Sequence, residues 1–204
     1  MANPDRPQGF KPSKTLSGAP VTGLIRKIAV AARTEGDTHG DIYIGQPISV
    51  SNTGVVTGAL SAGLDAIGVV VGVGVDNIEH GETGMWKADD LEARYLPDAT
   101  AGYVWYVPIN DVLFEIQTGA DLDLSPGMGC DYGLTTTDFV ATNENHGNTT
   151  TGHSIMEISS ANATGGSLRV VEDVTSPDND TSLTNARHLV AFTNGRFGQL
   201  VTLS

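Results

Sequence analysis

The sequence has little of what disulfide-bonded, zinc-binding or membrane-spanning proteins depend on. One of its 204 residues is cysteine, 17% are charged and 6% are aromatic. Cys130 alone cannot form an intrachain disulfide and cannot supply a cysteine-based zinc site. No run of 18 apolar residues predicts a transmembrane helix. The N-terminus lacks the apolar segment of a secretory signal, so the three N-x-S/T triplets are not expected to carry glycans.

Signatures of catalysis, cofactors and metals are also missing. The glycines of residues 66–75 are spaced G-x-x-x-G-x-G within a valine run, whereas dinucleotide binding needs G-x-G-x-x-G between a strand and a helix. Asp121 and Asp123 lack the rest of a calcium loop, and His146 and His153 have no third ligand in a supporting pattern. We therefore expect no cofactor, no metal and no catalytic residue. Carboxylates are plentiful, so residue type alone leaves glycosidase chemistry open.

What the chain does contain favours strands and turns. It has 25 glycines, about 12% against a usual ~7%, and short runs rich in valine and isoleucine. Such a composition is poor helix material. The predicted fold is all-β, a sandwich or barrel of short antiparallel strands. The expected strands cover residues 24–33, 42–50, 55–60, 66–75, 104–107, 112–117, 155–158, 167–174, 186–194 and 197–203, with one helical turn at 87–96.

The clearest local pattern lies in residues 102–119. Two strand-like runs, 104–107 and 112–117, flank the turn formers of Pro-Ile-Asn-Asp, and this predicts a hairpin. Val112, Phe114 and Ile116 share one face of the second run and are the predicted core of the hairpin. Leu113, Glu115 and Gln117 share the other face, which is expected to be exposed to solvent. Trp105 and Tyr106 should point to opposite faces, so one of them is expected to meet a neighbouring subunit.

Charge is distributed unevenly along the chain. The net charge is −13, which disfavours a nucleic-acid binder. Residues 1–33 nevertheless hold six basic residues and one acidic residue, whereas residues 34–204 hold five basic and 23 acidic. Such an asymmetry often marks an interaction arm.

Residues 1–23 contain four prolines and three glycines, and too few apolar residues to fold alone. We expect an extended basic arm ordered by a partner, with a disordered tail as the alternative. The body would then comprise residues 24–204, divided into two subdomains near residue 120. Removing residues 1–23 is expected to leave this body folded. The expected contact residues of the arm are Arg6, Phe10, Lys11, Lys14 and Leu16.

Several phrases of the sequence resemble one family. They are ANPDRPQGFKP, PINDVLFEIQ, TTTGHSIMEI, LRVVEDVTSPDND and NARHLVAF, in that order along the chain. Together they resemble the small head decoration, or capsid cement, proteins of tailed phages. The resemblance implies a non-enzymatic homotrimer on the outer surface of the virion head, with a terminal arm that reaches over the major capsid protein. Its implied partners are the capsid and its own copies, without nucleic acid or membrane.

Two other functions stay open from the sequence. One is an adhesion module that binds host-surface glycans through exposed aromatic residues, for which Trp86, Trp105 and Tyr106 are the candidates. The other is an enzyme, which the missing G-x-S-x-G and H-E-x-x-H motifs disfavour.

Overall fold

The computed structural model describes residues 3–31, 41–50, 56–58, 66–75, 95–97, 100–133, 147–148, 151–162 and 165–193. Within these residues the chain forms short strands and one 3-10 turn, η1 (Val21–Leu24). The predicted all-β fold is confirmed, and every pairing between the named strands is antiparallel. The expectations for Trp86, His146, residues 87–94 and residues 197–203 lie outside the described residues.

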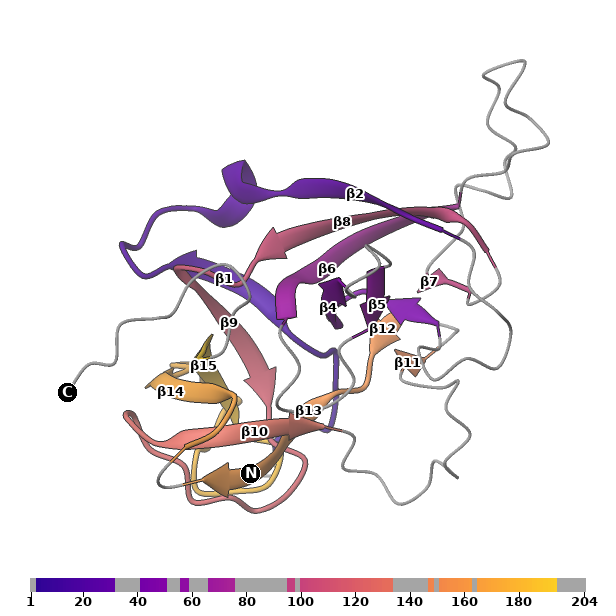
Figure 1. The fold of residues 1–204 in the computed structure, drawn as a ribbon. Coiled ribbons are helices and arrows are strands. Elements are labelled where there is room, and N and C mark those ends of the chain that lie inside the picture. The colour runs from indigo at the N-terminus through magenta and orange to yellow at the C-terminus, as the bar shows by residue number, and fades with distance from the viewer. Residues whose placement is uncertain are drawn as a thin grey trace, which may run out of the picture.

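Two sheets contain most of the described strands (Figure 1). The six-stranded sheet has the order β1 (Lys11–Thr15), β9 (Val112–Gln117), β15 (Arg187–Phe192), β14 (Leu168–Asp173), β10 (Gly129–Gly133) and β13 (Glu157–Asn162). The five-stranded sheet has the order β2 (Arg26–Val30), β8 (Gly102–Pro108), β6 (Ala66–Val75), β4 (Pro47–Val50) and β5 (Val56–Gly58). Two small ribbons pair β3 (Ile42–Tyr43) with β7 (Tyr95–Leu96), and β11 (Gly147–Asn148) with β12 (His153–Ser154).

One local expectation is wrong, and another is described only in part. Of the predicted helical turn at 87–96, the structure describes Tyr95 and Leu96, and these two residues form strand β7. The predicted hairpin of residues 102–119 does not form, because β8 pairs with β2 and β6 whereas β9 pairs with β1 and β15. The chain turns a corner at residues 109–111, where Asp111 adopts a φ of 60°. Turn formers mark a change of direction, but they do not decide whether the next strand returns beside the last one or enters another sheet.

The N-terminal part of the chain runs antiparallel to the segment that forms this corner. Strand β1 pairs with β9 and β2 pairs with β8, so residues 11–30 follow residues 102–117 through both sheets. Thr15 lies opposite Val112 and Arg26 opposite Tyr106. Ten residues, 16–25, therefore cross the corner in the N-terminal segment, whereas five residues, 107–111, cross it in the paired segment. We call the ten, residues 16–25, the corner loop.

The main core lies between the two sheets and a second cluster lies on the other face of the five-stranded sheet. Val112, Phe114 and Ile116 are at most 1% exposed, so their predicted place in the core is confirmed. The predicted wet face of β9 is wrong, because Leu113 and Gln117 are also buried. The six-stranded sheet takes β1 and β9 from before residue 120 and its other strands from after it. A division near residue 120 therefore does not separate the sheets.

Candidate functional site

The N-terminal segment is part of the body. We call residues 3–15 the strap. Phe10 is 1% exposed and lies edge-on to Phe114 and Tyr132, at centroid distances of 6.3 and 5.2 Å, with Phe192 at 4.9 Å. These three rings come from β9, β10 and β15, so the six-stranded sheet curls around Phe10. The expectation that Phe10 anchors an arm on a neighbour is wrong, since its own core takes the ring.

Two glycines let the strap cross the body closely. The N–H of Phe10 donates to the carbonyl of Gly45 at 2.8 Å. Gly9 and Gly45 have φ values of 65° and 83°, in the left-handed region that favours glycine. A Cβ on Gly9 would lie 2.7 Å from the Cβ of Ser154, and one on Gly45 would overlap the carbonyl oxygen of Gln8. The sequence could have suggested this crossing only through the glycines themselves.

Polar side chains fix the beginning of the strap. The amide of Asn3 donates to the carbonyls of Asp180 and Thr184, at 2.8 and 2.9 Å, and accepts from the N–H of Asp180 at 2.7 Å. Asn3 is buried although it is polar, because backbone groups satisfy its amide. This end of the strap is therefore tied to the loop between β14 and β15.

A second buried amide ties the strap to β9. Gln117 Nε2 donates to the carboxylates of Asp5 and Glu157, at 3.1 and 2.8 Å, and its Oε1 accepts from the N–H of Arg6 at 3.1 Å. Both amide hydrogens and the amide oxygen thus have partners, which is the condition for burying such a group without penalty. The strap therefore satisfies the buried Gln117 amide of β9 together with Glu157.

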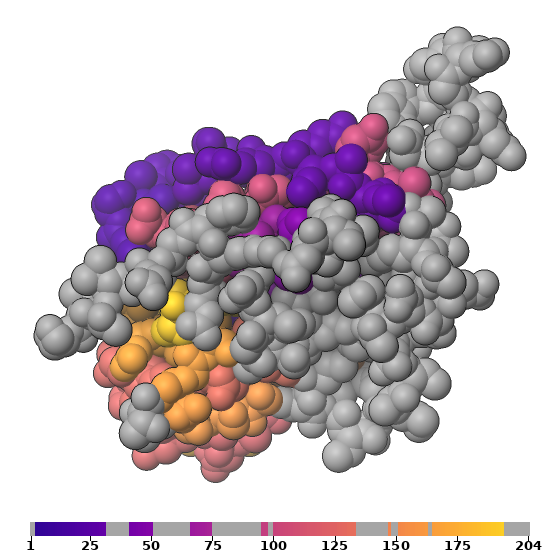
Figure 2. Space-filling model, viewed as in Figure 1, coloured from indigo at the N-terminus to yellow at the C-terminus, as the bar shows by residue number. Residues whose placement is uncertain are grey.

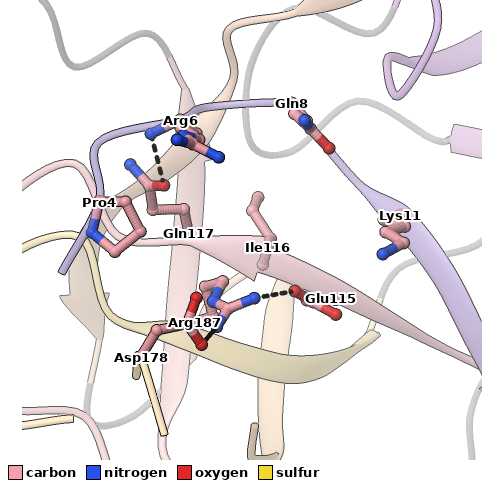
Figure 3. Close-up of a pocket in the computed structure, with 10 residues that line it drawn as sticks. Pro4, Arg6, Gln8, Lys11, Glu115, Ile116, Gln117, Asp178 and Arg187 are labelled. Carbon is pink, nitrogen blue, oxygen red and sulfur yellow. Dashed lines mark hydrogen bonds and ion pairs between the residues drawn. The ribbon is translucent and has the colours of Figure 1, made fainter. Parts of the chain in front are cut away.

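The basic residues predicted for the arm have different environments. Lys14 forms an ion pair with Glu172 of β14. Lys11 and Arg6 line a hollow of about 200 Å³ between the strap and β9 (Figure 3). Arg187 bridges Glu115 and Asp178 on the opposite wall, at 3.2 and 2.6 Å. The hydrogen bond from Ser176, with the charge of Arg187, lowers the pKa of Asp178 below its usual value.

Three of the five large apolar residues that are exposed in the described chain lie in the corner loop. Leu16, Leu24 and Ile25 are 49%, 36% and 45% exposed. Arg26 and Lys27 follow at once on β2 and are exposed too. Among the described residues β2 pairs only with β8, so it is an edge of the five-stranded sheet in this part of the chain. Figure 2 shows this N-terminal stretch, in indigo, along the upper surface of the molecule.

We call residues 22–27 the basic edge. It joins exposed apolar side chains to two cations in a chain whose net charge is −13. Sequence reasoning assigned Leu24 to Lys27 to the first strand and missed their exposure. The signal that could have revealed it is the adjacent apolar pair followed by an adjacent basic pair, which breaks the alternation of a half-buried strand.

The aromatic residues of β8 lie beside the basic edge. Lys27 Nζ is 3.8 Å from the ring centroid of Tyr103 and 5.3 Å from that of Trp105. Trp105 is half-buried, and its ring lies over Gly72 and Gly74 of β6. Tyr106 packs instead against the second core cluster. Of the two residues expected at a subunit interface, Trp105 contacts Lys27 of the basic edge, and its contact with a neighbour stays a prediction.

No metal or reactive group stands out in the part of the chain that the structure describes. That part holds no group of three or more His, Cys, Asp or Glu side chains able to bind a metal. Burial raises the pKa of the Cys130 thiol to about 12, so this thiol is unreactive near neutral pH. The part of the chain that the structure describes has no helix with the length and apolar character needed to span a membrane.

Comparisons with protein-family models, with curated proteins and with solved structures find no match to this chain.

Proposed function

We propose that the chain is a non-enzymatic structural protein of a phage virion that binds the outer surface of the head and cements the shell. The sequence phrases quoted above support the class of protein. The observation that carries the proposal is the basic edge, where Leu24, Ile25, Arg26 and Lys27 are exposed on one side of a packed two-sheet body. The proposed partners are the major capsid protein and further copies of the chain, without nucleic acid or membrane.

Strand β2 offers the route of attachment. An edge strand presents backbone groups to which a strand of a capsid subunit can add, and such pairing supplies affinity. Leu24 and Ile25 would bury apolar surface on contact, and Arg26 and Lys27 would face acidic groups of the shell. The contact surface proposed here therefore lies in residues 16–27, because the strap is occupied by its own body.

Replacing Ile25 with aspartate is expected to weaken binding to the shell by more than tenfold. Burying an isoleucine stabilises a contact by about 1.5–3 kcal/mol, and a tenfold change in affinity corresponds to about 1.4 kcal/mol. An unpaired carboxylate in the contact adds to that loss. The measurement is cosedimentation of the purified protein with expanded, undecorated heads.

The control for this variant is Leu183→Asp. Leu183 is 37% exposed, which is similar to the exposure of Ile25, but it lies in the loop between β14 and β15. The substitution places the same aspartate away from the basic edge, so binding of this variant to heads should match that of the wild type. Equal binding by both variants would remove the basic edge from the proposal, and failure of the wild-type protein to bind heads would overturn the function itself.

Glycan adhesion is the second candidate, and Trp105 favours it. Its half-buried ring lies on a sheet face close to Tyr103, where a sugar ring could pack. If this is the function, Trp105→Ala should reduce binding to host-surface glycans at least tenfold and leave head binding unchanged. A wild-type protein that binds no glycan on an array of host-surface sugars would exclude this candidate.

A further inference from the structure

The strap and the corner loop are held in opposite ways. The strap is fixed by the body through Asn3, Gln117, the crossing at Gly45 and the ring of Phe10. Strand β1 is also an edge, since among the described residues it pairs only with β9. It can therefore leave the sheet without breaking any other pairing of these strands.

The corner loop is held largely by itself. Thr15 donates its N–H to the carbonyl of Ala19, and its own carbonyl and hydroxyl accept from the N–H groups of Gly18 and Ala19. One backbone bond, from Leu16 to the carbonyl of Asp111, joins the loop to the opposite crossing. Except for Val21, which packs against the main core, residues 16–25 are exposed. Opening this loop thus costs few contacts.

The loop is also twice as long as the crossing on the paired segment. Five residues, 107–111, cross the same corner on the paired segment, whereas the loop uses ten. Ten extended residues reach roughly 33–36 Å, which is enough to carry the strap away from its own body. Two glycines, Gly18 and Gly23, have open space around them and ease such a change.

We propose that the strap is exchangeable between copies. Residues 3–15 of one chain can take the position of residues 3–15 on the body of a second chain, and the reverse, so that two copies are linked. Every strap contact is remade in the exchanged form, and only the corner loop differs. The balance between the two forms is then set by concentration and by the loop. The partner is a second copy of this chain, whether or not the protein binds a capsid.

The test uses two single-cysteine variants, Lys11→Cys and Glu115→Cys. Residues 11 and 115 are directly opposite on β1 and β9, a spacing that a disulfide can bridge. The two variants are unfolded together under reducing conditions, refolded at high concentration, oxidised, and analysed by mass spectrometry. Cys130 is buried and does not compete. An 11–115 disulfide between two chains requires that the strap of one chain lies on β9 of the other.

Two controls make the outcome decisive. The double variant, with both cysteines in one chain, should form the bond and shows that the geometry permits it. Ser160→Cys places an exposed thiol on β13, the other edge of the same sheet, and reports random collisions with Lys11→Cys. We expect at least tenfold more 11–115 than 11–160 disulfide in the mixtures. Equal yields, or no bond between chains while the double variant forms its own, would overturn the exchange.

Discussion

Replacing Phe10 with alanine should lower the free energy of unfolding by about 3–5 kcal/mol. The ring is 1% exposed and contacts aromatic rings from three strands of the curled sheet, so its removal leaves a cavity that the backbone cannot easily close. For a chain of this size the melting temperature should fall by roughly 6–20 °C. Urea unfolding followed by circular dichroism measures the change.

Leu16→Ala is the control, because Leu16 is close in sequence and 49% exposed. It should change stability by less than about 0.5 kcal/mol. The pair distinguishes a strap from a free arm. An arm anchored on a neighbour would tolerate Phe10→Ala in the isolated protein and lose only partner binding. The same reasoning reverses the expectation that removal of residues 1–23 leaves a folded body, since that deletion takes away β1 and Phe10 together.

Local sequence patterns predicted where strands lie better than they predicted which strands pair with one another. Alternation and β-branched residues located β8, β9 and β14. The same patterns could not say that β8 and β9 enter different sheets. Pairing depends on which apolar faces meet across the whole fold, and a four-residue turn carries no information on that.

The candidate surface was predicted in part. The uneven charge pointed to residues 1–33, which contain the basic edge proposed above, but composition could not separate the strap from the basic edge. Prolines and polar residues gave the strap the signature of a disordered arm. Its burial depends on distant partners instead: Asn3 is satisfied by the loop between β14 and β15, and Phe10 by rings more than 100 residues away. Such long-range satisfaction leaves no local trace in sequence.

Replacing Gly45 with alanine should destabilise the protein far more than the same change at Gly18. Both residues have a φ of 83°, so both substitutions impose the left-handed cost of about 1–2 kcal/mol. Gly18 has open space around it, whereas a Cβ on Gly45 would overlap the carbonyl oxygen of Gln8 and lie 3.3 Å from the nitrogen of Phe10. We expect Gly45→Ala to cost a further 2–3 kcal/mol, within the range of the most damaging point substitutions.

The mechanism of this loss can be checked by a double-mutant cycle. If Gly45→Ala acts by displacing the strap, much of the cost is the withdrawal of Phe10 from the aromatic cluster. The double variant should then lose clearly less stability than the sum of the losses of the two single variants, with a coupling of about 1–3 kcal/mol. The pair Gly18→Ala and Phe10→Ala should be additive within about 0.5 kcal/mol. Additivity at Gly45 as well would show that the crossing and the ring act independently, and that the strap is not held as one unit.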